Sequence, residues 1–135
     1  MKRGQTSIEY VILVGILLFF MIPIIQYALT EAQTNVKVNQ LDTSTRRIAK
    51  AADTVFSLGK GASEVITITI PPGILASKIT GHEVVYTVSL LGTQTDIEHV
   101  TKPAIQGSIP ILPGTYNIVI RMLETNNVSI EQKTK

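Results

Sequence analysis

The 135-residue sequence contains no cysteine and no tryptophan, and aromatic residues make up only 5% of it. Without cysteine the chain can form no disulfide, no thiolate nucleophile and no cysteine-ligated metal centre. Its two histidines, His82 and His99, are far apart, and a metal site would need further ligands at set spacing. We therefore expect surface or strand histidines, and no metal or other cofactor.

Charge is also scarce, at 16% of residues, with a net charge of +2. Lys2 and Arg3 account for that whole excess, and the basic and acidic residues after them balance. A basic stripe with interleaved aromatic residues, the usual footprint of a nucleic-acid surface, is missing from the sequence. We therefore expect no nucleic-acid partner.

Catalytic patterns are missing as well. The sequence has no phosphate-binding glycine loop, dinucleotide fingerprint or Ser/His/Asp order. Asp96, Glu98 and His99 lie together in "TDIEHV", but alternation along a strand places His99 on the opposite face from the two acids. The chain is therefore not expected to be an enzyme.

A long uncharged apolar run dominates the N-terminal part of the chain. Residues 10–25 read "YVILVGILLFFMIPII", and the run extends to Leu29. A helix of about 20 such residues spans the roughly 30 Å hydrocarbon core of a bilayer. The run exceeds the about 7–15 apolar residues of a secretory signal, and no small-x-small cleavage pattern follows except around Ala28 and Ala32. We predict a retained membrane-spanning helix.

The flanking charges predict the orientation of this helix. Lys2 and Arg3 precede the run, whereas Glu31 follows it and the next cation is Lys37. The positive-inside rule then places the N-terminus in the cytoplasm and the remainder outside. Pro23 lies within the run and removes one backbone donor, so a kink or local opening is expected there.

The helical pattern continues beyond the apolar run. Apolar or small residues recur at steps of three and four, and the glycine-rich "SLGKGAS" then ends the helix. The sequence predicts one helix from about Thr6 to Leu58, apolar all round at first and amphipathic later. Its apolar stripe packs either on the chain's own sheet or on neighbouring subunits, and consists of Val38, Leu41, Thr45, Ile48, Ala52 and Val55.

After Ser63 the apolar period changes from helical to alternating. Turn signals at 71–73, 80–82, 91–94, 113–114 and 124–127 separate short segments rich in β-branched residues. Six or seven strands at this spacing predict an α+β protein, with a long N-terminal helix followed by a small antiparallel β-sandwich. The strand segments are "EVITITI", "HEVVYTVSL", "TQTDIEHV", "AIQGSIPI", "TYNIVIRML" and "NVSIEQ".

The first residues resemble a known targeting pattern. The segment "KRGQTSIEY" before the apolar run is similar to the class III signal peptide of archaeal type IV prepilins, a basic leader and glycine followed by Gln-x-Ser-x-Glu-Tyr. Lys2, Arg3 and Gly4 match the leader, and Gln5 and Glu9 match the motif. "IPPGI" at 70–74 and "LPGTYNIVI" at 112–120 also resemble pieces of archaeal pilin heads.

The resemblance implies a maturation step and a domain organisation. A membrane prepilin peptidase would cut between Gly4 and Gln5, so that residues 1–4 are a leader and the apolar segment stays on the mature chain. The helix then occupies residues 5–59, apolar over 5–29 and amphipathic over 30–59. An extracellular head follows at 60–135.

The resemblance also implies a function. The chain would be a structural subunit of a pilus-like surface filament that serves attachment, as a homo-oligomer with like subunits. Its other partners would be the peptidase, the assembly ATPase and the membrane platform. The precursor would reside in the cell membrane and the assembled form at the cell surface. Major and minor subunits fit the pattern equally well.

Glu9 has two interpretations. A carboxylate in the first turn of a helix is favoured by the helix dipole by about 0.3–1 kcal/mol, and Thr6 with Glu9 fits the spacing of a capping box. The resemblance instead implies that cleavage creates an α-amine on Gln5, which pairs with Glu9 of its own or a neighbouring subunit in the filament. The two interpretations are compatible.

Two other functions and one modification stay open. A membrane-tethered binding or sensory module would share the anchor but would tolerate loss of Glu9, and an archaellin would share the layout. Asn127 begins an "NVS" sequon for N-glycosylation in an expected turn.

Overall fold

The computed structural model describes the backbone of residues 3–90 and 92–133, and within these ranges the side chains from residue 8 onward. One helix precedes seven strands in the described ranges. They are α1 (Arg3–Leu58), β1 (Ser63–Ile70), β2 (Ile74–Thr80), β3 (Glu83–Leu90), β4 (Thr93–Val100), β5 (Ala104–Gly107), β6 (Gly114–Met122) and β7 (Asn127–Gln132). The predicted α+β class, a long helix followed by a small sheet head, is confirmed.

Helix α1 ends where the glycine signal predicts. Gly59 has a positive φ of 91°, and its N–H donates to the carbonyls of Val55 and Phe56 at 3.2 and 3.3 Å. A glycine in this left-handed conformation satisfies otherwise unpaired carbonyls of the last turn. At its other end the helix begins at Arg3, three residues before the predicted start at Thr6.

The chain forms two compact units, one ending at Val36 and one beginning at Lys37. The second unit contains the C-terminal part of α1 together with all seven strands. Residues 37–58 of the helix therefore belong to the folded head.

The strands form two sheets, with the orders β1-β6-β7-β5 and β2-β3-β4. Neighbouring strands are antiparallel except β5 and β7, which pair in parallel. This one pair departs from the predicted antiparallel sandwich, since β6 lies between the two strands in sequence and pairs with the other edge of β7. Strand β2 was also absent from the predicted segments, since "ILASKIT" contains Ala, Ser and Lys, which favour strands weakly.

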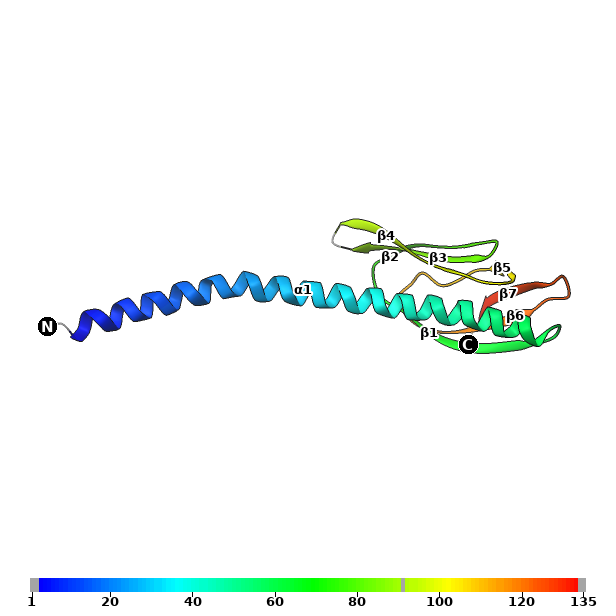
Figure 1. Cartoon of the computed structure of the whole chain (residues 1–135), viewed down its shortest axis with the longest axis horizontal. Coiled ribbons are helices and arrows are strands. Elements are labelled where there is room, and N and C mark those ends of the chain that lie inside the picture. Colours follow the sequence, from blue (N-terminus) through cyan, green and yellow to red (C-terminus); the bar gives the residue numbers. More distant parts are fainter. Residues whose placement is uncertain (1–2, 91, 134–135) are drawn as a thin grey trace. The chain divides into compact units, whose positions relative to one another are not determined.

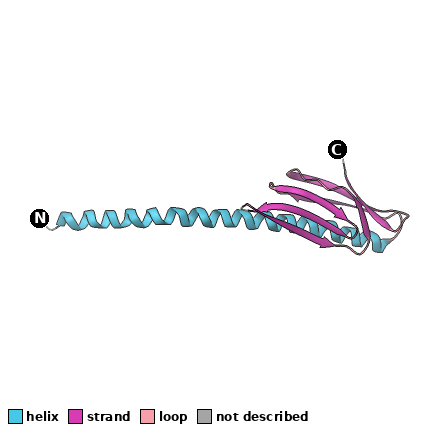
Figure 2. Cartoon of the chain, turned by 90° about the horizontal axis from the view of Figure 1, so that it is seen from above, coloured by secondary structure: helices cyan, strands magenta, loops and turns pink. Residues whose placement is uncertain are grey.

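The head has one core that the helix and both sheets share. Figure 1 shows the C-terminal part of α1 running alongside both sheets, and Figure 2 shows the strands over this same part of the helix. Leu41, Ile48, Ala52 and Val55 of the predicted stripe are each 0% exposed and belong to the core cluster. The prediction that the stripe packs on the chain's own sheets is confirmed. The largest strand residues in this core are Tyr86, Ile68, Ile70, Ile118, Ile120 and Ile130.

Candidate assembly surface

The first compact unit presents an apolar surface on every side of the helix. Phe19 and Tyr27 are 72% and 73% exposed, and between residues 10 and 29 only Val14 is even partly covered. Among the described residues, α1 is the one helix long and apolar enough to cross a membrane by length and composition. The most exposed large side chains of this surface are Tyr10, Val11, Leu13, Phe19, Phe20, Ile24 and Tyr27.

This surface requires an apolar environment. Transfer of one large aliphatic or aromatic side chain from water to an apolar medium is favourable by about 1.5–3 kcal/mol. A contiguous apolar surface of this size is not stable in water and marks a membrane or protein contact. Residues 8–29 can therefore face lipid, other apolar helices, or each in turn.

Pro23 lies inside α1 without interrupting it. Helical residues continue on both sides of this proline, so it does not end the helix. Proline has no N–H, so the carbonyl one turn earlier loses its ordinary partner. Further along, Thr30 and Thr34 donate their hydroxyls to the carbonyls of Gln26 and Thr30 at 2.9 and 3.0 Å, which satisfies the polar side chains locally.

The predicted processing residues lie at the start of α1. Gly4 and Gln5 have helical backbone, their side-chain placement is not described, and Lys2 lies outside the described residues. The first four N–H groups of a helix have no partner within it, so this end unwinds at low cost. The bond between Gly4 and Gln5 is thus in the part of the helix that a peptidase can most readily extend.

Glu9 is exposed, and no ion pair that the structure describes involves it. The capping box with Thr6 is wrong, because α1 begins at Arg3 and Thr6 is therefore inside the helix. A capping residue must stand before the first turn, with non-helical backbone. Arg3 and Gly4 already have helical backbone, so the helix starts earlier than predicted.

The head carries an ion pair that the sequence did not predict. On β4, Asp96 and Glu98 are exposed while His99 is half-buried, which confirms the predicted alternation. His99 Nε2 lies 2.9 Å from Asp42 Oδ1, and Arg46 Nη2 lies 2.9 Å from Asp42 Oδ2. The hydrogen bond from His99, with a further contribution from Arg46, lowers the pKa of Asp42. Since 57 residues separate Asp42 from His99, no local pattern could reveal the pair.

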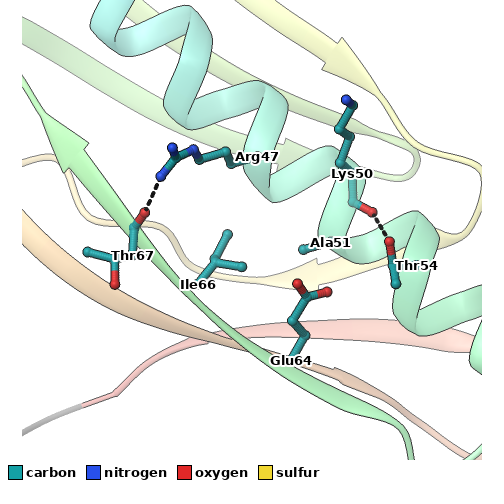
Figure 3. Close-up of a pocket in the computed structure, with 7 residues that line it drawn as sticks. All are labelled: Arg47, Lys50, Ala51, Thr54, Glu64, Ile66 and Thr67. Carbon is teal, nitrogen blue, oxygen red and sulfur yellow. Dashed lines mark hydrogen bonds between the residues drawn. The ribbon is translucent and has the colours of Figure 1, made fainter.

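Polar residues of α1 also cover the open edge of β1. The Ser44 hydroxyl donates to the carbonyl of Thr69 at 2.7 Å and accepts from its N–H at 3.3 Å. Arg47 donates to the carbonyl of Thr67 at 3.3 Å (Figure 3). β1 is the outermost strand of its sheet, so these bonds satisfy groups that another strand would otherwise pair with.

A hollow of about 330 Å³ lies beside this covered edge. Figure 3 shows Arg47 directed to Thr67, and the Glu64 carboxylate rising between β1 and the helix. The lining combines one acid, two cations and short apolar side chains. These residues are Arg47, Lys50, Ala51, Thr54, Glu64, Ile66 and Thr67.

The glycosylation candidate lies on a paired strand. Asn127 was expected in the turn at 124–127, but it is half-buried and is the first residue of β7. Ser129 is only 9% exposed, and β7 is bonded on both sides, to β6 and β5. Glycosylation acceptors are typically in exposed loops, so this position disfavours modification of the folded head.

Hydrogen bonds from Tyr86 and Ser77 connect the three-stranded sheet to the segment between β5 and β6. The Tyr86 hydroxyl donates to the Pro110 carbonyl at 3.3 Å, and burial raises the pKa of this tyrosine. Beside it, Ser77 on β2 donates to the carbonyl of Ile109 at 3.1 Å. The segment between β5 and β6 is thereby fixed to the three-stranded sheet.

Comparison with family models, with curated proteins and with solved structures gave no match for this chain. The residues themselves therefore carry the functional argument. They combine a head that has its own apolar core with a helix whose apolar side chains are exposed.

Proposed function

We propose that this chain is a structural subunit of an archaeal type IV pilus-like surface filament that serves attachment. The observation that carries the proposal is the apolar surface of residues 10–29, exposed on all sides and preceded by a single acid, Glu9. A soluble protein would bury such a surface, and an acid beside a membrane span is costly for a simple anchor. The resemblance of residues 2–10 to prepilin leaders agrees with both features.

The proposed maturation begins with the precursor in the membrane, N-terminus in the cytoplasm and head outside. The prepilin peptidase cuts after Gly4, which gives Gln5 a new α-amine. The assembly ATPase and membrane platform then extract the subunit, and its apolar helix exchanges lipid for the helices of other copies. A minor subunit would be less abundant in the filament than a major one, but its cleavage and assembly would follow the same steps.

Glu9 acquires its role in the assembled state. A carboxylate buried without a partner costs several kcal/mol, whereas an ammonium group within about 4 Å stabilises its charged form. The Gln5 amine, on the same or a neighbouring subunit, supplies that positive charge. Only one axial offset between neighbouring helices would bring the acid and the amine together. The pair would therefore select this offset among the many that apolar contacts alone allow.

The test replaces Glu9 by Gln in the full chain and follows two readouts. Mass spectrometry of surface filaments should find the unmodified chain beginning at Gln5. The E9Q variant should still be cut after Gly4 but should yield about tenfold fewer filament subunits, since the amine then lacks its counter-charge. Glu31→Gln, an exposed acid on the same helix beyond the apolar run, is the matched control and should assemble normally.

An uncut membrane monomer as the sole form of the chain would contradict the proposal, as would normal filament yield from E9Q. A membrane-tethered binding module is the second candidate, favoured by the hollow beside Arg47, Lys50 and Glu64. It predicts that Glu9→Ala has no effect and that a small ligand protects these residues from chemical modification.

A further inference from the structure

One face of the head is acidic. In β3, Val84, Tyr86 and Val88 point into the core, so the residues between them point outward. The register with β4 pairs outward Val85 with Glu98 and outward Thr87 with Asp96, and these acids therefore share the outer face. We call this surface the acidic sheet face, and its exposed acids are Glu83, Asp96 and Glu98. One cation, Lys78 of β2, lies on the same outer face, because it pairs with outward Val85, which separates it from Glu98.

A second face of the head is basic. The outer side of residues 37–58 exposes Arg46, Arg47 and Lys50, which we call the basic helix face. The two acids of this helix segment are engaged by the head. Asp42 pairs with His99 and Arg46, and Asp53 Oδ1 accepts the backbone N–H of Lys102 at 2.8 Å.

The two faces match in charge and in spacing. Arg46 and Lys50 are four residues apart on one helix side, which corresponds to a rise of about 6 Å. Asp96 and Glu98 are two residues apart on one strand face, which corresponds to about 6.7 Å. The spacing of the two carboxylates therefore matches that of the two cations, of which Arg46 also pairs with Asp42 of its own chain.

The like charges within each face also repel one another when the face has no partner. Like charges on neighbouring positions of a helix or strand repel, and a surface of opposite sign placed against them relieves that repulsion. Within the described residues, the structure has ion pairs only around Asp42. Glu83 and Glu98 are thus available to an external cation, and Lys50 to an external carboxylate.

We infer that the acidic sheet face of one copy docks on the basic helix face of a second copy. The inference rests on the proposed filament and specifies its head-to-head contact. Because the two faces are different surfaces of the same chain, the contact is heterologous, and each bound copy leaves one face free for the next. A heterologous contact that does not close into a ring generates an open helical polymer.

A charge exchange in the full-length chain tests this contact. Lys50→Glu or Glu98→Lys alone should each lower the filament yield about tenfold, since each places like charges against one another across the interface. The double variant restores opposite charges and should recover the yield. Lys60→Glu and Glu131→Lys, which make the same charge changes at exposed positions off both faces, are the controls.

Cysteine cross-linking gives an independent readout, because the chain has no cysteine of its own. A lysine–glutamate pair holds its two Cα atoms farther apart than the about 4.4–6.8 Å that a disulfide needs, so a reagent with two maleimides and a flexible spacer replaces direct oxidation. After treatment with this reagent, filaments of the double variant Lys50→Cys/Glu98→Cys should give a ladder of covalent multimers. The pair Lys50→Cys/Thr115→Cys, with Thr115 exposed on the other sheet, should give none.

The outcomes separate this inference from the proposed function. Filaments that assemble without a ladder, and without rescue in the charge exchange, overturn the contact and leave the filament intact. If the unmodified chain stays in the membrane as an uncut precursor, the filament proposal fails. The cross-linking is then repeated on membranes that contain the double cysteine variant. Absence of a ladder there overturns the contact. Loss of binding to anionic lipid vesicles in K50E, with no rescue by E98K, would assign the basic helix face to lipid instead.

Discussion

The two parts of α1 contain the same types of apolar residue, but these residues are exposed in the first part and buried in the second. Ile16, in the first part, is 54% exposed, whereas Ile48, in the second, is 0% exposed. Both lie in one uninterrupted helix, so local conformation does not distinguish them. The difference is that residues 37–58 pack against strands of their own chain, while residues 8–36 have no such neighbour within their compact unit.

This contrast separates two sources of stability. The second part of the helix is stabilised by the chain's own core, and its surroundings need only solvate the polar side. The first part depends on what surrounds it, because nearly all of its apolar surface is unburied. A substitution should therefore affect folding in one part and membrane residence or assembly in the other.

The largest loss of head stability should come from Gly107→Ala, which leaves the first part of the helix unchanged. Gly107 has a φ of 128°, and a Cβ there would overlap the backbone carbonyl of Ile130 on the neighbouring strand. We expect a loss of about 3 kcal/mol or more in the free energy of unfolding of the head. Gly81→Ala is the control, with a positive φ but open space around it, and should cost about 1 kcal/mol.

Denaturant unfolding of the purified chain in detergent, followed by far-ultraviolet circular dichroism, measures both variants. The strand signal should be lost early in Gly107→Ala, while the helical signal of the detergent-embedded segment persists. Equal stability of the two glycine variants would contradict the assigned clash.

The next effect compares matched isoleucines on the two parts of the helix. Ile48→Ala removes a fully buried side chain from the head core and should cost about 2–5 kcal/mol. Ile16→Ala should leave the unfolding of the head unchanged, since this exposed side chain belongs to the other compact unit and is not a member of the core. The same denaturant titration measures both variants. A similar loss in the free energy of unfolding of the head from each would show that the two parts of the helix do not differ in their contribution to the fold.

The smallest effect concerns the pair between Asp42 and His99. Because the pKa of Asp42 is lowered in the fold, its contribution to stability is present above the ordinary aspartate pKa of about 3.9 and is lost as the pH falls through the lowered value. Asp42 is 35% exposed, so solvent screens the pair and the contribution should stay below about 1 kcal/mol.

Asp42→Asn should therefore lower the melting temperature slightly at neutral pH and should weaken its decline between about pH 5 and about pH 2. Glu124→Gln, which removes one carboxylate from an exposed turn, is the matched control. An unchanged acid slope in Asp42→Asn would show that the pair makes no contribution to stability.

Patterns within short windows predicted much of this architecture. The steps of three and four from Leu41 to Val55 correctly identified the buried side of the helix, and the glycine after Leu58 correctly ended it. Turn residues marked the ends of most strands, but "ILASKIT" was missed because its exposed edge position places few demands on composition. The parallel pairing of β5 with β7 was also missed, since strand order depends on contacts between distant segments.

The candidate site divides in the same way. Glu9, the apolar run and the residues around Gly4 could be proposed from sequence because they are contiguous. The pair between Asp42 and His99, and the cover that Ser44 and Arg47 provide for β1, could not be identified. They join residues 20 to 57 positions apart that only the packed helix brings together.

The sequence by itself determined the long helix, its change from apolar to amphipathic, and the β character of the head, because these follow from hydrophobic periodicity along the chain. Tertiary structure alone decided the strand order and the burial of the helix stripe beneath two sheets. A periodic pattern specifies which side of an element is apolar, whereas the element that it meets is chosen by the packing of the whole core.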